Sequence, residues 1–559
     1  MKIASAIIWR HKMKSFVSQG RCIESIHYMV KMSENIEKME AMVRAGEYFI
    51  VSRPRQFGKT TTLYSLAQVL SKEYIIINMD MIDLDHEAFS SGRAFSKAFC
   101  LQVMDHILES RESDLLLPDT VADSIASIAR GETTANLQQL FSLIRKWCRN
   151  SFKPVVLFID EVDAAEGSDV FRDFLGKLRS AFIKRDPENM NITFQSVILA
   201  GVTDVEHLKS GIRPDDETRR RGSPWNIASN ITIPMELPAK GVQQMLQEYK
   251  KDHGIRMNVK KVTDAIMKWT NGYPYLVSRI CEILDTEMVP GRFKSLTKAW
   301  TTAGVDEAAT KIVTEDSSLM SSLMGKINND PALAQDLSDF LYKGKNISYS
   351  IDNERQRSFL LYGFARVSGA RLMIANEIFR VRLCRKFDDD FHNKSPRDKA
   401  VWDAGEASKN KYVDPAGDLN VYRILEDFLI TFTRVRKIST LPDEEAQENE
   451  FIEDVGCRQF LLYLTPVING AGTYSIEEQT LDRRRMDVVI HYHGKRYILE
   501  IKIWHGAKYN SDGEQQLRGY LDYFNLNVGY MLTFSFNKYK KVGIDTHTID
   551  GRILHEAIV

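Results

Sequence analysis

One short segment, residues 48–70, limits the folds open to this chain more than any other feature. It places the apolar run YFIVS, the loop RPRQFGKT and the helical pattern TTLYSLAQVL in direct succession. Another apolar run, YIIINMD, follows at 74–80. Strand and helix patterns that alternate at this spacing predict a parallel α/β sheet covered by helices.

Two later apolar runs extend the same sheet. PVVLFID at 154–160 and SVILAGV at 196–202 are continuously apolar, which is typical of central parallel strands buried on both faces. From about 236 to 300 the strand patterns stop and helical patterns dominate. We therefore expect a helical lid after the sheet.

The loop RPRQFGKT matches the phosphate-binding pattern GxxxxGK[ST] at its last three positions and misses the first, where Arg53 stands. Gly58 allows the backbone to approach phosphates, Lys59 supplies a positive charge, and Thr60 supplies a hydroxyl for Mg²⁺. The other expected nucleotide contacts are Arg55, Gln56, Phe57 and Thr61. Taken alone, the Gly-Lys-Thr triplet also fits an ordinary turn before a helix.

Acidic residues follow the strand at 154–160. Asp160 is placed to hold Mg²⁺ through water, and Glu161 to polarise the attacking water. A loop start or a helix cap would explain such a pair too, but strand context at both motifs favours a nucleoside triphosphatase. Thr203 and Asp204 end the next strand, where a γ-phosphate sensor and a plain turn fit equally well. The basic run at 219–221 fits either a solvated loop or an arginine finger.

Five segments are recognisable as a set: HYMV (27–30), YFIVSRPRQFGKTTTL (48–63), FIDEVD (158–163), SPWNIAS (223–229) and NGYPYLV (271–277). Together they resemble the bacterial AAA-ATPase-like family. The resemblance implies an ATP-binding P-loop ATPase that uses Mg²⁺. It also implies that Arg53 at the first loop position is a feature of the family.

A second group of polar residues lies in RRRMDVVIHYHGKRYILEIKIWHG at 483–506, which we expect to form a hairpin with strands at 486–492 and 496–503. Residues i and i+2 share one face of a strand, so Glu500 and Lys502 project together and Asp487 can face them. Two carboxylates make an oxygen-rich Mg²⁺ site, and a lysine beside them can activate water. A plain cross-strand pair is the alternative. Burying an acidic side chain in such an apolar strand costs free energy, which favours a functional role for these residues.

Gln516 and Tyr520 lie one turn apart on the next predicted helix. Their pattern resembles that of RecB-like members of the PD-(D/E)xK superfamily, over about 448–559. This resemblance implies a metal-dependent DNA nuclease using Mg²⁺ or Mn²⁺, with a further glutamate from the preceding helix. Glu453 and Glu450 are both eligible, and Glu453 is favoured. The arginines at 483–485 fit either DNA phosphate contacts or a solvated surface.

The expected order is an N-terminal leader (1–35), a P-loop AAA-like ATPase core (36–235), a helical lid (236–300), a winged-helix-like unit (301–387), a linker (388–419) and an α/β PD-(D/E)xK nuclease domain (420–559). Lys plus Arg and Asp plus Glu both number 75, so DNA must be bound by local patches and not by net charge. No apolar run approaches the roughly 20 residues of a membrane span. Together with scattered cysteines, this favours a cytoplasmic protein.

The predicted function is an ATP-controlled, metal-dependent DNA nuclease, with ATP and DNA as partners and a homo-oligomer compatible with the architecture. The alternative is a nucleotide-dependent switch or DNA remodeller whose C-terminal domain binds nucleic acid without cutting it.

Overall fold

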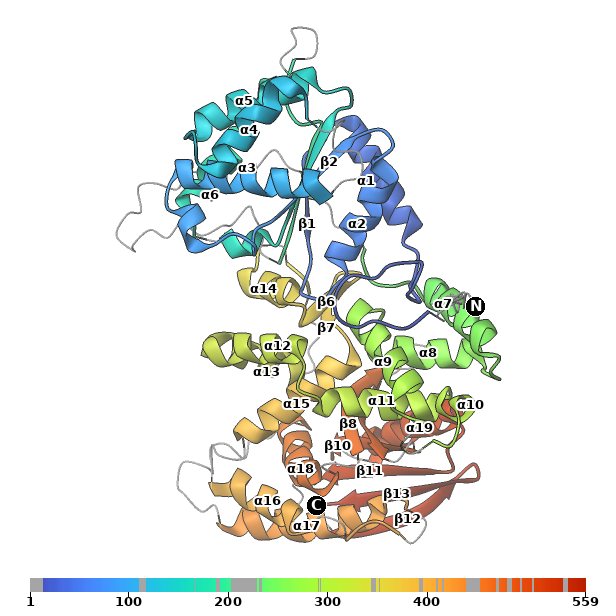
Figure 1. The fold of residues 1–559 in the computed structure, drawn as a ribbon. Helices are drawn as coiled ribbons and strands as arrows, with labels where there is room; N and C mark the ends of the chain where they lie inside the picture. The colour runs from blue at the N-terminus through green and yellow to red at the C-terminus, as the bar shows by residue number, and fades with distance from the viewer. Residues whose placement is uncertain are drawn as a thin grey trace, which may run out of the picture. The chain divides into compact units, whose positions relative to one another are not determined.

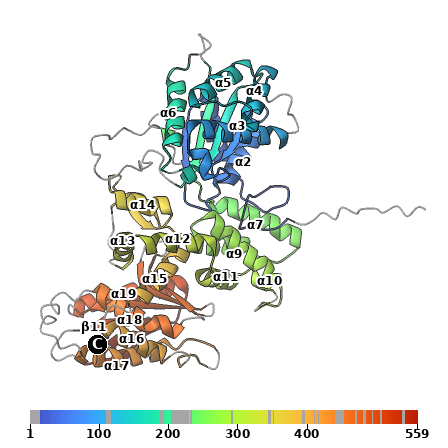
Figure 2. The same cartoon turned by 60° about the vertical axis from the view of Figure 1, so that its left-hand side comes forward.

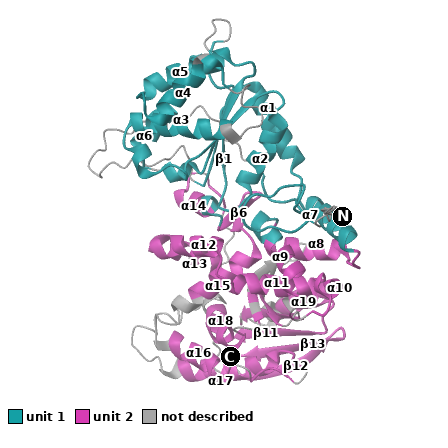
Figure 3. Ribbon diagram, viewed as in Figure 1, with its two compact units in different colours: residues 1–253, 272–278, 360–363 teal, residues 254–271, 279–359, 364–559 magenta. Residues whose placement is uncertain are grey.

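The computed structural model of the chain describes residues 14–109, 117–165, 167–186, 192–202, 229–230, 234–289, 291, 293–342, 348–350, 352–391, 396–408, 411–414, 417–438, 453–468, 472–479, 485–492, 495–504, 507–535 and 541–559. Contacts divide the chain into two compact units (Figure 3). Unit 1 comprises Met1–His253, Gly272–Ser278 and Leu360–Gly363. Unit 2 comprises Gly254–Asn271, Arg279–Phe359 and Phe364–Val559.

Unit 1 contains a five-stranded sheet with the order β2-β3-β4-β1-β5, in which all neighbouring strands are parallel. Its strands are β1 (Phe49–Ser52), β2 (Ile75–Asp80), β3 (Val155–Asp160), β4 (Ser196–Gly201) and β5 (Ser229–Asn230). Its helices are α1 (Ser33–Ala45), α2 (Lys59–Leu70), α3 (Gly92–Glu109), α4 (Asp119–Arg130), α5 (Leu137–Asn150), α6 (Asp169–Ile183) and α7 (Ala239–His253), with 3-10 turns η1 (His86–Phe89) and η3 (Val162–Ala165). The predicted parallel α/β sheet is confirmed.

The sheet of unit 1 is covered on both faces, which is why its central strands are apolar throughout. Alternate residues such as Leu157 and Leu199 pack with α3, α5 and α6 in one continuous core that includes Phe95 and Phe174. Helices α1 and α2 lie on the other side (Figure 1 and Figure 2). This three-layer arrangement places the carboxyl ends of β1, β3 and β4 at one edge of the sheet.

Part of the segment expected to be a leader is packed into unit 1. Phe16 and Tyr28 are buried, and their rings lie 5.2 and 5.3 Å from the ring of Tyr249 in α7. The Tyr28 hydroxyl also donates to Asp252 at 3.0 Å. Aromatic residues spaced along an irregular segment carry no helix or strand period, so the sequence alone did not indicate this packing.

Unit 2 contains a six-stranded mixed sheet with the order β12-β13-β11-β10-β9-β8 and a two-stranded hairpin, β6-β7. Its strands are β6 (Ala365–Ser368), β7 (Arg371–Ile374), β8 (Gly472–Gln479), β9 (Arg485–Tyr492), β10 (Lys495–Ile503), β11 (Val528–Phe534), β12 (Gly543–Ile549) and β13 (Arg552–Ile558). The remaining helices are α8 (Val259–Thr270), α9 (Pro274–Thr286), α10 (Leu296–Ala299), α11 (Thr302–Thr314), α12 (Ser318–Asn329), α13 (Pro331–Tyr342), α14 (Glu354–Tyr362), α15 (Glu377–Phe391), α16 (Pro396–Glu406), α17 (Val421–Ile438), α18 (Glu453–Ile468) and α19 (Ala507–Phe524). The expected hairpin at 486–503 corresponds to the antiparallel pair β9 and β10.

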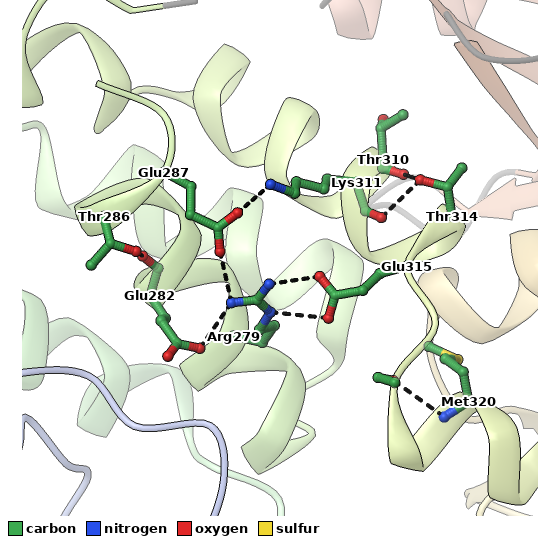
Figure 4. A network of polar contacts seen from close by, with 10 residues as sticks. Arg279, Glu282, Thr286, Glu287, Thr310, Lys311, Thr314, Glu315 and Met320 are labelled. Atoms are coloured by element: carbon green, nitrogen blue, oxygen red, sulfur yellow. Dashed lines mark hydrogen bonds and ion pairs between the residues drawn. The ribbon is translucent and has the colours of Figure 1, made fainter. Parts of the chain in front are cut away.

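A network of charged residues joins the helices that follow the first sheet (Figure 4). Arg279 of α9 donates to both carboxylate oxygens of Glu315, at 3.1 and 2.7 Å, and also pairs with Glu282 and Glu287. Lys311 of α11 pairs with Glu287. Because the Arg279 and Glu315 side chains are only 16% and 20% exposed, this bidentate pair fixes α9 against the end of α11.

Helices α8 and α15 contact the C-terminal sheet within unit 2, and α8 is joined to α11. Trp269 of α8 donates to Asp306 of α11 at 2.7 Å, and its ring lies 5.4 Å from His491 of β9. Arg385 of α15 donates to the carbonyl of Gly472 in β8 at 2.8 Å. Residues 301–387 combine helices with the β6-β7 hairpin, and their winged-helix character stays a prediction.

The segment 388–419, expected to be a linker, contains the end of α15 and the whole of α16. Helix α16 lies so close to α18 that a Cβ at Gly405 would be 2.3 Å from the Tyr463 carbonyl oxygen. Farther along, the hydroxyl of Tyr412 lies 2.6 Å from Asp427 and 2.7 Å from the hydroxyl of Tyr463. The polar composition of this segment, with its Pro and Gly residues, predicts a connector, whereas Gly405 permits close packing of α16 against α18.

Candidate functional site

The loop between β1 and α2 has the geometry that its Gly-Lys-Thr sequence predicts. Gly58 caps α2 in the left-handed region, with φ of 82°, and Lys59 begins the helix. A residue with a side chain would be strained at this φ, so the glycine is required here. The first backbone N–H groups of α2 are therefore free of intrahelical partners at the end of β1, which is a favourable place for an anion.

Lys59 is buried beneath this loop. Its ammonium donates to the carbonyls of Arg53 at 3.1 Å and Pro54 at 3.2 Å, and the residue is 5% exposed. Burial lowers the pKa of Lys59 below its usual range, while the nearby carboxylates of Glu161 and Asp160 oppose that shift. Burying the ammonium group costs free energy. Together with the first backbone N–H groups of α2, it is placed to bind a multiply charged anion.

Two oxygen ligands meet where α2 begins and β3 ends. The Thr60 hydroxyl donates to the Asp160 carboxylate at 2.8 Å, across 100 residues of sequence. Both residues line a groove of about 1230 Å³, so a hydrated cation can reach them. A hydroxyl and a carboxylate are ligands that Mg²⁺ accepts, so these residues fit the expected metal.

Glu161 follows Asp160 in the left-handed region, with φ of 50°. Its backbone N–H donates to the Asp160 carboxylate at 2.9 Å. Burial raises the pKa of Glu161, and the positive charge of Lys59 works in the opposite direction. A carboxylate with a raised pKa beside a phosphate loop is suited to accept a proton from water.

The strand order brings these groups together. Strand β4 lies between β1 and β3, and all three end at the same edge of the sheet. At the end of β4, a Cβ on Gly201 would lie 2.6 Å from Val162 and 2.8 Å from Asp163. The Asp163 carboxylate also accepts the N–H of Val202 at 2.9 Å. Asp163 thus fixes the end of β4, a role that FIDEVD did not reveal because it depends on a contact between strands.

The other expected loop residues take different roles. The Arg55 carbonyl accepts a hydrogen bond from the Tyr273 hydroxyl at 2.6 Å, and the rings of Phe57 and Tyr273 meet edge to face at 4.6 Å. Thr61 accepts the backbone N–H of Cys22 at 3.2 Å. Gln56 adopts φ of 56°. The Asn-Gly-Tyr-Pro sequence predicts a sharp turn between helices that can also bring the lid near a nucleotide base, but it does not predict the contact of Tyr273 with Arg55 and Phe57.

In the C-terminal sheet, Glu500 and Lys502 lie on the same face of β10, as their spacing predicts. Glu500 is fully buried, and its carboxylate lies 2.9 Å from the ammonium of Lys502. Helix α19 covers this face: a Cβ on Gly513 would lie 3.2 Å from Cε of Lys502. The two charged groups are therefore held between a sheet and a helix.

Helix α19 also carries the expected Gln516 and Tyr520. The Gln516 amide donates to the Tyr520 hydroxyl at 2.7 Å. Tyr520 is buried and packs with Ile498, the residue two before Glu500 in β10, and with Val489 of β9. All four predicted residues of β10 and α19 thus belong to the same side of the sheet.

Several expected site residues lie outside what the structure describes. The positions of Thr203, Asp204, Glu450 and the arginines at 219–221 and 483–484 fall in segments that are not described. The backbones of Asp487 in β9 and Glu453 at the start of α18 are described, but their side chains are not. Among the described residues, no group of three or more His, Cys, Asp or Glu is arranged to hold a metal ion.

The helices that the structure describes include none with the length and apolar character needed to cross a bilayer.

Comparison with solved structures gives distant similarities. The Walker-type ATPase PABY2304 of Pyrococcus abyssi matches 64% of this chain and 96% of its own, at 12% identity and a TM-score of 0.43. The RuvB Holliday junction branch migration motor of Thermotoga maritima matches 64% and 95%, at 13% identity and a TM-score of 0.31. Orc1 of Aeropyrum pernix, solved in complex with DNA, matches 64% and 93%, at 9% identity and a TM-score of 0.28.

No curated protein matches the chain. Comparison with protein families matches residues 17–381 to the AAA-like domain, which takes in the sheet of unit 1, the phosphate loop and the helices as far as α15. The match covers well over half of the 559 residues. The chain therefore belongs to the AAA-like domain family.

Proposed function

We propose that the loop at 53–60 binds ATP with Mg²⁺ and that the site hydrolyses it. The observation that carries this proposal is the meeting of Lys59, Thr60 and Asp160 at the carboxyl edge of a parallel sheet. Lys59 would exchange its carbonyl partners for the β and γ phosphate oxygens, and Thr60 with Asp160 would hold the metal. A Mg²⁺ bound there would neutralise charge on the phosphates. Glu161 would orient the attacking water and accept its proton.

Nucleotide binding by purified full-length protein tests this proposal. Lys59→Ala should lose affinity for ATP by at least about tenfold, because a charge-assisted contact with phosphate is removed. Lys72→Ala is the matched control, since Lys72 is an exposed lysine just beyond the other end of α2. Equal binding by the two variants would refute the proposed site.

Hydrolysis separates the role of Glu161 from the roles of the binding residues. Glu161→Gln should retain ATP binding while kcat falls by roughly 10²-fold or more, the usual size of a general-base contribution. The measurement is phosphate release at saturating ATP. Turnover at the wild-type rate would remove Glu161 from the proposed mechanism.

We further propose that the C-terminal sheet carries a metal-dependent DNA nuclease. The buried Glu500–Lys502 pair beneath α19 carries this proposal. Burying a glutamate and a lysine side by side costs free energy that an apolar pair would not, which favours a functional reason for the pair. The Gln516–Tyr520 pair on the same side supports the resemblance to RecB-like nucleases.

The backbone register supports a role for Asp487. Strands β9 and β10 pair Ile498 with Val489 and Leu499 with Val488. Continued by one residue, this register sets Asp487 opposite Glu500. Residues directly opposite in an antiparallel pair lie on the same face, so both carboxylates would belong to the side covered by α19.

This arrangement assigns the steps of phosphodiester hydrolysis to named groups. Asp487 and Glu500 would supply oxygen ligands for Mg²⁺ or Mn²⁺, and the bound metal would polarise the scissile phosphate. Lys502 would position the attacking water and stabilise the negative charge that develops on the phosphate. Gln516 and Tyr520 would orient Lys502 and the DNA backbone, and Glu453 would contribute from the start of α18.

Cleavage assays test the nuclease with a closely matched control. Glu500→Gln should abolish cleavage of single-stranded, duplex and branched DNA in Mg²⁺ and in Mn²⁺. Glu556→Gln removes another buried glutamate from the same sheet, two strands away, where Glu556 accepts from Thr533 at 2.8 Å, and it should retain cleavage. DNA binding without cleavage by the wild-type protein in either metal would favour the non-cutting alternative.

Control by ATP is the last part of the proposal, because one chain carries both groups of residues. Cleavage by the wild-type protein should change when ATP is added, and cleavage by Lys59→Ala should not. If ATP leaves wild-type cleavage unchanged, the two sites operate independently.

A further inference from the structure

We infer that Tyr273 is a positioning residue for the phosphate loop, which has Arg53 where the pattern GxxxxGK[ST] has its first glycine. The inference rests on the proposed nucleotide function and adds to it a residue from outside the loop. Its basis is a set of contacts on both sides of one strained residue, Gln56.

Gln56 is the point of strain in the loop. Its φ of 56° lies in the left-handed region, which costs energy for any residue with a side chain. Such a conformation persists only when the surroundings hold it in place. The loop has Arg53, and not glycine, at its first position, so it has less freedom to relax than a loop with glycines at both ends.

Tyr273 holds the loop on both sides of Gln56. Its hydroxyl donates to the carbonyl of Arg55, directly before Gln56, at 2.6 Å. Its ring packs edge to face against Phe57, directly after Gln56, with ring centres 4.6 Å apart. The next residue of the turn, Pro274, lies 4.0 Å from the position of a Cβ on Gly58.

The turn that carries Tyr273 is itself firmly held. Asn271 and Gly272 adopt φ of 47° and 76°. The Gly272 carbonyl accepts the N–H of Leu237 at 2.8 Å, and a Cβ on Gly272 would lie 2.5 Å from the Leu237 carbonyl oxygen. Tyr273 is 3% exposed. The phosphate loop is thus supported by a buried side chain, Tyr273, on a turn whose backbone is hydrogen-bonded to Leu237.

The consequence for nucleotide binding follows from peptide geometry. In a planar trans peptide the C=O and the N–H of the next residue point in opposite directions. Tyr273 holds the carbonyl of Arg55, and this contact does not have to be broken when Lys59 turns to the phosphates. The N–H of Gln56, which belongs to the same peptide, is therefore turned away from Tyr273. Oriented N–H groups in such a loop are what a phosphate requires.

A single-atom deletion tests this role. Tyr273→Phe keeps the ring contact with Phe57 and removes only the hydroxyl, so the Arg55 carbonyl loses its donor. The KM for ATP and the Kd for a fluorescent ADP should rise about five- to tenfold, the usual effect of one hydrogen bond. The value of kcat should stay within about twofold, because the loss is of uniform binding. A merely structural role would lower the melting temperature without separating KM from kcat.

The matched control is Tyr275→Phe, which removes a hydroxyl from a buried tyrosine in the first turn of α9, two residues after Tyr273. It should leave KM and Kd unchanged. Unchanged or tighter nucleotide binding by Tyr273→Phe, or an equal loss in Tyr275→Phe, would overturn the inference. Failure of the wild-type protein to bind nucleotide, or wild-type affinity in Lys59→Ala, would instead refute the proposed nucleotide function.

A second pair of variants tests the contact between the phosphate loop and Gly363. Gly363 has φ of 85°, and a Cβ there would lie 2.9 Å from the ring of Pro54 and 3.9 Å from the Tyr273 hydroxyl. Gly369 has φ of 62° and open space around it. Both alanine variants carry the cost of a left-handed φ, but only Gly363→Ala should weaken nucleotide binding severalfold. Equal nucleotide affinity in the two variants would contradict a loop held from outside.

Discussion

Buried charge is the feature that distinguishes individual residues of this protein. Lys59, at the start of α2, is 5% exposed, and Lys502 and Glu500, in β10, are 8% and 0% exposed. Removing such groups from water costs several kcal/mol unless partners compensate. Both groups of charged residues coincide with a motif found in the sequence, and this coincidence is why we propose a function for each group.

The Glu500–Lys502 pair leads to a prediction about stability. Lys502→Met should destabilise the protein by roughly 3 kcal/mol at neutral pH, because it leaves a buried carboxylate without its ammonium partner. Adding Glu500→Gln to that variant should restore much of the loss. Urea unfolding of the two single variants and the double variant measures the coupling. Additive effects would show that the 2.9 Å contact contributes little.

His27 leads to a prediction about pH. The N–H of Ile23 donates to Nδ1 of His27 at 3.0 Å, and burial lowers the pKa of His27 below its usual 6.5. A base with a lowered folded-state pKa contributes stability that is complete above pH 6.5. That contribution is lost as the pH falls from 6.5 through the folded-state pKa.

His27→Asn keeps an acceptor for the Ile23 N–H and does not titrate. The free energy of unfolding of the wild-type protein should therefore fall relative to this variant between pH 7.5 and pH 5, by less than about 1 kcal/mol because the ring is partly exposed. Parallel pH profiles for the two proteins would contradict the assignment.

At the scale of secondary-structure elements, close approach depends on particular glycines. Helix α16 contacts α18 through Gly405, where a Cβ would lie 2.7 Å from Pro466 and 2.3 Å from the Tyr463 carbonyl oxygen. Helix α12 contains Gly325, which has open space around it. The same residue type therefore has opposite effects in two helices of unit 2.

Alanine substitutions should separate these two cases. Gly405→Ala should destabilise unit 2 by about 1–3 kcal/mol, because the methyl group would push α16 away from α18. Gly325→Ala should be neutral or stabilise by up to about 1 kcal/mol, because alanine favours a helix over glycine. Thermal unfolding measures both. A neutral Gly405→Ala would indicate that α16 is a loose connector, as its composition first suggested.

The phosphate loop shows which features of an element can be predicted from local sequence. The strand, the loop and the helix start lie where the apolar run and Gly-Lys-Thr place them, because each depends on neighbours within a few residues. The contact of Tyr273 with Arg55 joins residues 218 positions apart. No periodicity in the sequence records such a contact.

For the molecule as a whole, the two compact units divide the chain differently from its sequence segments. Residues 254–271 and 279–359 belong with the C-terminal sheet, whereas 272–278 and 360–363 belong with the phosphate loop. Helix α9 therefore begins in unit 1 and continues into unit 2. The lid predicted at 236–300 is helical, but it is shared between the units.

This division predicts how nucleotide affects unfolding. Calorimetry should resolve two transitions, and ATP with Mg²⁺ at about 100 times its Kd should stabilise the unit 1 transition by about 2.7 kcal/mol. The shift should be absent in Lys59→Ala. A nucleotide-induced shift of both transitions by the same amount would contradict separate unfolding and indicate that the units unfold together.

The sequence alone determined the parallel sheet, the phosphate loop, the Thr60–Asp160 meeting and the shared face of Glu500 and Lys502. These follow from strand and helix periods and from the rule that parallel strands end at one edge. Only the tertiary structure decided that Phe16 and Tyr28 pack on α7, that α16 contacts α18, and that Tyr273 and Gly363 contact the phosphate loop. Those contacts depend on how the side chains of distant segments fit together. Such a fit leaves no periodic pattern in the local sequence.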